Sequence, residues 1–176
     1  CSGDSIQIGA NTTIGYSYKW SPFTNINNIN ISNPWVNISN FTNKPDTFKY
    51  IVSTTLENCT SKDSIRIEIR PLPVPEAGPD VSFCSGDTLQ IGIPPTNGYT
   101  YIWTPINGLS DKSVSNPTVT LLNLGTSPDS FMYKVKTTFY NCSLYDSVYV
   151  KVRPYPIANA GRDTNVCSGD SIQIGT

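Results

Sequence analysis

The chain opens with the nine residues Cys1-Ser2-Gly3-Asp4-Ser5-Ile6-Gln7-Ile8-Gly9. A near-copy of this stretch runs from Cys84 to Gly92, and a third begins at Cys167, so the stretch recurs every 83 residues. Repetition at a fixed period is the signature of a tandem array in which each repeat is one structural unit. The 176 residues therefore span about two periods of such an array.

Two Pro-rich stretches, at 71–75 and 154–156, mark the joints between repeats. Proline fixes φ and removes a backbone donor, so a strand should end at each joint and a short, stiff connector should follow. These joints predict three segments. Residues 1–72 are a first repeat that lacks its N-terminal strand, 73–155 are a complete second repeat, and 156–176 begin a third.

Short runs of alternating apolar and polar residues succeed one another in the complete repeat, and no window shows helical periodicity with caps. Trp103, Phe131 and Tyr133 supply the large side chains that a small core needs. About six or seven short strands separated by regular turn signals predict an all-β fold of tandem immunoglobulin-like β-sandwich repeats of 83 residues. The expected strands lie near 74–83, 88–91, 99–103, 119–121, 131–135 and 148–152.

Composition and charge argue against several classes of function. The net charge is −1, which leaves no basic stripe for nucleic acid, and no apolar run approaches the ~20 residues of a membrane span. Histidine, the commonest general base and metal ligand, is absent. We therefore expect no enzyme active site, no cofactor and no bound metal.

Five cysteines follow the period of the array. Cys1 and Cys59 recur as Cys84 and Cys142, and the counterpart of Cys59 that would follow Cys167 lies beyond Thr176. An extracellular disulfide framework accounts for all five, with Cys167 left unpaired by truncation. A zinc site would need clustered Cys or His, and the chain has no Cys-x-x-Cys.

Two disulfide pairings remain open. One bridge within each repeat would join Cys1 to Cys59 and Cys84 to Cys142. Each of these cysteines is expected in a turn, however, and the two turns of a repeat should lie at opposite ends of the sandwich, roughly 25 Å apart. A disulfide needs Cα atoms within about 7 Å. This geometry favours a staggered bond from Cys1 to Cys142 in the following repeat, with Cys84 reaching the repeat after.

Trp35 is the candidate for a surface contact. Val36 and Ile38 are expected to face the core, and alternation along the strand then turns Trp35 outward. An outward indole could stack on a sugar or on a neighbouring protein, whereas a position at the edge of the core is the structural alternative.

Asp followed by Ser or Thr and an apolar residue recurs at the starts of the expected strands. A short carboxylate in a turn accepts hydrogen bonds from nearby backbone N–H groups, which explains the motif without a further role. The Ser and Thr residues concerned are Ser5, Ser64, Thr88, Ser147 and Ser171.

The order of motifs carries a resemblance to a known family. The chain has Ala-Gly-x-Asp, Cys-Ser-Gly-Asp-(Ser/Thr), Tyr-x-Tyr-x-Trp-(Ser/Thr)-Pro, Asn-Pro, Tyr-x-Val, Asn-Cys, Asp-Ser-(Ile/Val) and a closing Val-x-Val-x-Pro-x-Pro. Over its whole length it resembles the PKD/immunoglobulin-like repeats of giant surface proteins in gliding Bacteroidota, the SprB-type gliding motility adhesins.

This resemblance implies export by type IX secretion to the exterior of the outer membrane. It also implies a structural stalk role in an adhesive filament that serves gliding motility, and O-glycans on the five Ser and Thr residues named above. The implied partners are neighbouring repeats of the same chain and, through regions outside these residues, surface polysaccharide or the gliding machinery of the outer membrane. The alternative function is a spacer or carbohydrate-binding β-sandwich module of a secreted multidomain enzyme.

Overall fold

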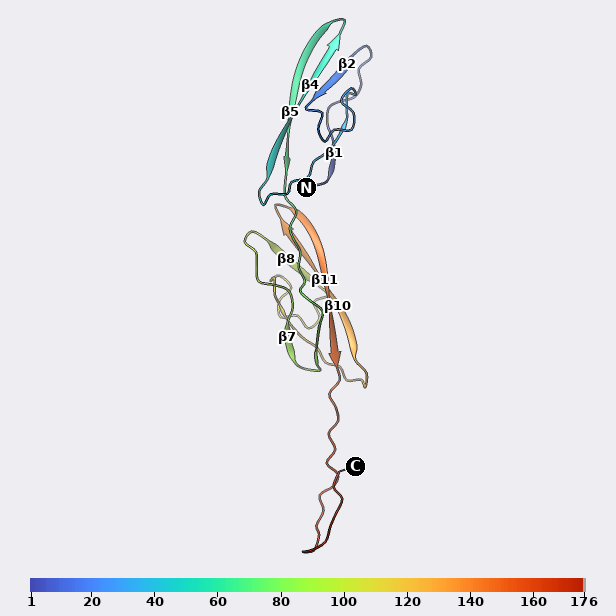
Figure 1. Cartoon of the computed structure of the whole chain (residues 1–176), viewed down its shortest axis with the longest axis vertical. Helices are drawn as coiled ribbons and strands as arrows, with labels where there is room; N and C mark the ends of the chain where they lie inside the picture. The colour runs from blue at the N-terminus through green and yellow to red at the C-terminus, as the bar shows by residue number, and fades with distance from the viewer. Residues whose placement is uncertain (176) are drawn as a thin grey trace.

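The computed structural model describes residues 1–175, in which every regular element is a β-strand. Two β-sandwich units lie end to end along the long axis, and the chain after Arg153 extends away from the second unit (Figure 1). Within the described residues, no helix is long and apolar enough to cross a membrane.

The first sandwich contains five strands in two sheets. β1 pairs with β3, and the second sheet has the order β2-β4-β5, all antiparallel. The strands are β1 (Ser5–Gln7), β2 (Ser17–Ser21), β3 (Trp35–Asn37), β4 (Asp46–Leu56) and β5 (Cys59–Ile69).

The second sandwich repeats these five strands and adds one. β7 pairs with β9, and the other sheet has the order β6-β11-β10-β8. The additional strand, β6, runs parallel to β11, with Val81 opposite Val150. The strands are β6 (Val81–Cys84), β7 (Thr88–Gln90), β8 (Thr100–Thr104), β9 (Thr118–Thr120), β10 (Asp129–Phe139) and β11 (Cys142–Arg153).

Each sandwich has its own core. Trp103 and Tyr133 are fully buried in the second unit, and Trp20 and Tyr50 are buried at the matching places of the first. Each indole donates a hydrogen bond of 2.9 Å to a backbone carbonyl 11 residues further along the chain. Most of the repeated core residues therefore build a similar interior in both units, as the alternation of apolar residues predicts, but Ile65 is 38% exposed where its counterpart Val148 is fully buried. The chain is an all-β protein of immunoglobulin-like β-sandwich class.

The hairpin of β10 and β11 is longer than the alternation predicts. Alternation predicts strands at 131–135 and 148–152. These residues form the half of the hairpin that covers the core, and the other half continues to the joint with the first unit. The expected turn at 141–143 is also displaced. Tyr140 and Asn141 have φ of 47° and 65° and form a two-residue turn, so Cys142 begins β11.

The expected strand at 74–83 is mostly irregular, because only its end forms β6. Pro75 and Pro79 have no N–H to donate to a ladder. Ala77 instead donates its N–H to the Oδ2 atom of Asp146 at 2.8 Å and is fully buried. This segment thus seals the side of the second core without joining its sheet.

Candidate functional site at the joint between the repeats

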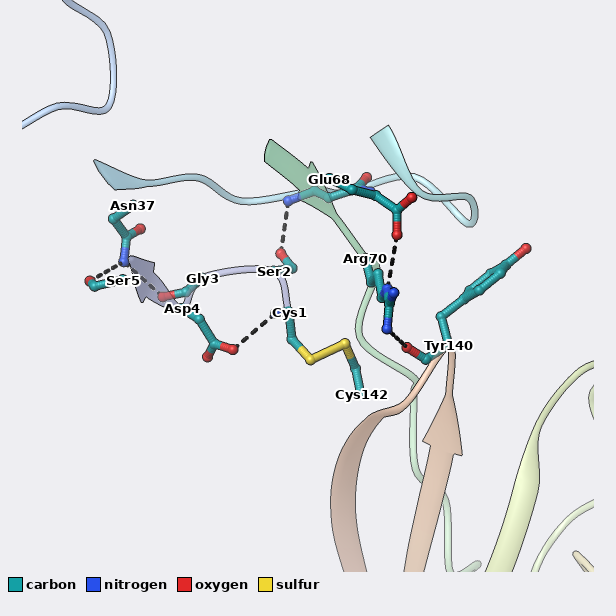
Figure 2. Close-up of polar contacts among 11 residues, drawn as sticks. Cys1, Ser2, Gly3, Asp4, Ser5, Asn37, Glu68, Arg70, Tyr140 and Cys142 are labelled. Carbon is teal, nitrogen blue, oxygen red and sulfur yellow. Dashed lines mark hydrogen bonds and ion pairs between the residues drawn. A yellow bond between two sulfur atoms is a disulfide. The ribbon is translucent and has the colours of Figure 1, made fainter. Parts of the chain in front are cut away.

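A disulfide crosses the joint between the two sandwiches. It links Cys1, at the beginning of the first unit, to Cys142, at the tip of the β10–β11 hairpin, with the Cα atoms 5.7 Å apart (Figure 2). The bond closes a loop with a sequence separation of 141. It therefore joins the two units a second time, beside the peptide connector.

A polar contact accompanies the disulfide. The Nη1 atom of Arg70 donates a hydrogen bond of 3.5 Å to the carbonyl oxygen of Tyr140, in the same hairpin turn as Asn141 (Figure 2). Glu68 holds the Arg70 guanidinium from the other side, with 2.9 Å between Oε1 and Nε. Both side chains of this ion pair are about half exposed, so its main effect is to orient Arg70 rather than to add stability.

The connector contacts the second unit. Pro71 and Pro73 are buried, although they lie between two folded units. Val74 donates its N–H to the hydroxyl of Tyr99 at 3.3 Å, and the Tyr99 ring lies 4.8 Å from the Phe139 ring, centroid to centroid. The connector therefore contacts Tyr99, and Tyr99 in turn packs on the hairpin that carries the disulfide.

A hollow of about 370 Å³ lies beside these contacts and is lined from both units. Its walls come from the 40–43 loop of the first sandwich and from the aromatic residues Tyr99 and Phe139 of the second. Phe41 is 94% exposed at its rim. The two units therefore meet through the strap and the connector rather than through a broad apolar interface.

The sequence pattern does not predict the contact between Arg70 and Tyr140 at the joint. A signal for Arg70 was present, because Arg-Pro occurs at the end of both repeats, as Arg70-Pro71 and Arg153-Pro154. Tyr140 contacts Arg70 through its backbone carbonyl, so its residue type does not indicate this contact.

The remaining cysteines lie apart from one another. Cys59, Cys84 and Cys167 carry free thiols, so neither of the bridges within a repeat is present. Cys59 lies at the far end of the first unit, opposite Leu56 in the β4–β5 hairpin. Cys84 ends β6, at the end of the second unit where Arg153 ends β11.

The five Ser and Thr residues of the Asp-(Ser/Thr) motif are all exposed and are spread along the molecule. Ser5 and Thr88 begin β1 and β7 as expected, but Ser64 and Ser147 lie inside β5 and β11 rather than at strand starts or in turns. Asp63 accepts the N–H of Ser64 at 2.7 Å, and Asp146 accepts that of Ser147 at 2.8 Å. Thr88 shares a hydrogen bond of 2.6 Å with the Thr120 hydroxyl. These residues form no common site.

Trp35 begins β3 and is 48% exposed, while its neighbour Val36 is fully buried. An open hollow of about 330 Å³ lies beside the indole. Its other lining residues are Ser5, Asn25, Ile26, Asn27 and Asn37. This place, on the side of the first unit, is separate from the strap.

No group of three or more acidic, Cys or His residues among residues 1–175 is placed to hold a metal ion. At the far end of the second unit, Tyr155 donates a hydrogen bond of 3.2 Å to the Oδ1 atom of Asp87. The negative charge of Asp87 raises the pKa of the Tyr155 hydroxyl above its ordinary value.

No family model matches the chain, and no curated protein matches it. Solved structures that resemble it are tandems of immunoglobulin-like domains. The I67-I69 fragment from the I-band of titin is 14% identical, with a TM-score of 0.36, over 87% of this chain and 61% of the titin fragment. BT4661, a SusE-like surface-located polysaccharide-binding protein from Bacteroides thetaiotaomicron, is 12% identical, with a TM-score of 0.35, over 85% of this chain and 31% of that protein.

Proposed function

We propose that the chain is a structural stalk segment of a long secreted cell-surface adhesin filament that serves adhesion and gliding motility. The observation that carries the proposal is the disulfide between Cys1 and Cys142 across the joint. A strap at this position supports a role in bearing tension, because it gives force a covalent route past both folded units.

The route can be followed along the chain. Force that enters at Cys1 passes through the disulfide to Cys142, along β11 to Arg153 and into the extended segment beyond. Residues 2–141 form a loop that the disulfide closes, so they carry none of this force. Because β11 is already extended, at about 3.3 Å per residue, pulling gains little length from it. Neither sandwich has to unfold for the route to stay intact.

Repeating the bond at the 83-residue period would extend the route through an array. Cys84 and Cys167 would then each reach the last hairpin of the repeat that follows its own. Stiff Pro-rich connectors and covalent straps at every joint suit a rod that stays extended under load. A disulfide framework also suits an oxidising location outside the cell.

The resemblance to the repeats of gliding adhesins supports the finer parts of the proposal. These parts are type IX secretion, a position outside the outer membrane, O-glycans on the exposed Ser and Thr residues, and a non-catalytic role. The partners proposed are neighbouring repeats of the same chain.

Single-molecule force spectroscopy tests the load route, with handles at the N-terminus and the C-terminus. The oxidised chain should show no unfolding event from either sandwich. After reduction, or in Cys142→Ser, two events should appear and should release roughly 480 Å in total, since 141 residues extend by about 3.4 Å each.

Cys167→Ser is the matched control, because Cys167 lies outside the closed loop and is exposed. It should behave as the unaltered oxidised chain does. Unfolding of the sandwiches in the oxidised chain, with the same released length as in the reduced chain, would exclude the load-bearing role.

Trp35 favours a second candidate function, that of a carbohydrate-binding module. The half-exposed indole beside an open hollow with three Asn side chains is the kind of surface on which a sugar stacks. Isothermal titration with bacterial and plant polysaccharides tests it. Binding that Trp35→Ala abolishes and that the exposed-position control Phe41→Ala retains would favour this function over the stalk.

A further inference from the structure

The basic side chains gather on one surface of each sandwich, although the net charge of the whole chain is only −1. In each unit, the sheet that contains the long hairpin turns one face to the core and the other to solvent. By this alternation, eight of the 12 Lys and Arg residues lie on the two outer faces. They are Lys19, Lys49, Lys62 and Arg66 in the first unit, and Lys134, Lys136, Lys151 and Arg153 in the second.

Acidic side chains are scarce on the same faces. Glu68 points outward in the first unit and is held by Arg70 at the joint. Asp80 precedes β6 at the edge of the second sheet, where it accepts the N–H of Tyr149 at 2.8 Å. The other carboxylates of these strands lie on the opposite side by alternation, namely Asp46, Asp63, Asp129 and Asp146. Among residues 1–175, none of the eight basic side chains forms an ion pair.

In the second unit the outer face combines these cations with exposed rings. The Nζ atom of Lys134 lies 4.4 Å from the centroid of the Tyr145 ring, and Lys136 is paired directly with Tyr145 across the hairpin. Tyr145 and Tyr149 are both about half exposed, although they lie in the middle of a sheet. We call Lys134, Lys136, Lys151, Tyr145 and Tyr149 the basic face. It lies along the β10–β11 hairpin, on one side of the second unit (Figure 1).

Gathering like charges in this way does not stabilise the fold. Lys49 lies directly opposite Arg66, and like charges in that position destabilise a sheet. Lys134 and Lys136 point to the same side of β10 with their Cα atoms about 7 Å apart. A bound polyanion would offset this repulsion, whereas nothing in the described residues does so.

The two units reach the same charge with different residues. The counterparts of Lys134 and Lys136 in the first unit are Ile51 and Ser53, and the counterpart of Lys62 in the second is Tyr145. The basic character of the outer face therefore recurs although its positions are not copied from one repeat to the next.

We propose that the outer faces bind an acidic polysaccharide, with the basic face of the second unit as its main contact. Lys134, Lys136 and Lys151 take its carboxylate or sulfate groups, and the exposed rings of Tyr145 and Tyr149 stack on the apolar faces of its sugars.

Two further features favour a sugar over a nucleic acid. Thr104 and Ser147 flank Lys134 in the register of the sheet, and their hydroxyls both donate and accept hydrogen bonds, as sugar hydroxyls require. The basic face also contains lysine and no arginine, whereas arginine is the residue that suits the phosphates of nucleic acid. The inference depends on the charge distribution alone, so it holds for a stalk and for a spacer, and its failure would leave the force measurement unaffected.

Biolayer interferometry with immobilised polygalacturonate and the full oxidised chain tests the proposal. The chain should bind polygalacturonate in dilute buffer and should not bind dextran, which is a neutral polysaccharide. Binding should be lost at about 1 M salt, where the Debye length falls to about 3 Å. Duplex DNA serves as the competing polyanion and should bind more weakly than polygalacturonate.

Two triple variants separate the basic face from charge in general. Lys134→Gln combined with Lys136→Gln and Lys151→Gln should raise the Kd for polygalacturonate at least about tenfold. Lys44→Gln combined with Lys112→Gln and Arg162→Gln removes the same charge from exposed positions elsewhere and should leave the Kd within about twofold. Thermal unfolding checks that both variants are folded.

Two single variants identify the kind of ligand. Tyr145→Ala should raise the Kd about three- to tenfold without changing the net charge. Trp35→Ala should leave it unchanged, because Trp35 lies in the other sheet of the first unit. The proposal would be overturned by a chain that does not bind polygalacturonate, by equal losses in the two triple variants, or by tighter binding to duplex DNA.

Discussion

A Cβ atom on Gly92 would lie 2.1 Å from the carbonyl oxygen of Ser115. The same relationship recurs in the first unit, where a Cβ on Gly9 would lie 2.0 Å from the carbonyl oxygen of Ser32. Two backbone segments touch at this place in each sandwich, directly beside the buried indole. Only glycine allows the approach, and the left-handed φ of 76° at Gly92 adds a second reason for it.

Gly92→Ala should therefore prevent the second sandwich from folding, whereas Gly86→Ala should not. Gly86 has a similar φ of 82°, but a Cβ there would meet only side-chain atoms at 3.6 Å or more. Gly86→Ala should lower the free energy of unfolding by about 1–2 kcal/mol, which is the penalty of the left-handed conformation alone. Thermal unfolding of the two variants measures the difference, and equal stabilities would show that the contact with Ser115 is easily relieved.

Asn123→Ala should destabilise the second sandwich by about 2–4 kcal/mol. The buried Nδ2 group donates to the carbonyl oxygens of Ser127 and Val152 at 2.8 and 2.9 Å, and Oδ1 accepts the N–H of Gly125. Removing the amide leaves several of these backbone groups without a partner inside the protein.

Chemical denaturation measures this loss, with Asn97→Ala as control. Asn97 is exposed, so its replacement should change the unfolding free energy by less than about 0.5 kcal/mol. Similar values for the two variants would mean that water replaces the amide at Asn123.

Tyr133 should make the second sandwich sensitive to alkaline pH. Burial raises the pKa of its hydroxyl above the ordinary value of 10.0, because desolvation penalises the phenolate. The unfolded chain ionises near pH 10, so the contribution of Tyr133 to stability is fully present below that pH and is lost as pH rises through the folded-state pKa.

Tyr133→Phe should cost about 1 kcal/mol at neutral pH, since the carbonyl of Asn107 loses its donor. It should also flatten the decline in stability above pH 10. Denaturation at stepped pH values measures both effects, and the exposed Tyr149→Phe should match the unaltered protein. An unchanged alkaline decline in Tyr133→Phe would assign the sensitivity to other groups, such as Tyr50, whose pKa burial also raises.

Backbone amides at the end of β5 should exchange with solvent at least about tenfold faster than those at the end of β11. β11 is paired on both sides, with β10 and β6, whereas β5 is paired only with β4. Hydrogen exchange with mass spectrometry on peptides from the two strands, in dilute solution, measures the ratio. Equal protection would show that an unpaired edge does not weaken the first sandwich.

Much of the fold follows from local pattern. The alternation of Trp103, Tyr133 and Val150 with polar neighbours assigns these residues to one face of a strand, because side chains along a strand point alternately to opposite sides. The period of 83 residues then carries the assignment from one repeat to the next. Trp35 is exposed, as alternation predicts, for the same local reason.

Features that depend on two distant segments could not be obtained in this way. The hairpin extends beyond the core to the joint, so the apolar pattern marks only half of it, and Cys142 lies in a strand rather than in the expected turn. Arg70 can donate its hydrogen bond to Tyr140 only because the two sandwiches lie end to end.

The sequence by itself determined the repeat, the all-β class and most residues of both cores, since each depends on spacings within a few residues or on a strict period. Only the tertiary structure decided which cysteine faces Cys1 and how Asn123 satisfies three backbone groups. Those outcomes depend on distances between residues far apart in the chain, and such distances are set by how whole sheets pack.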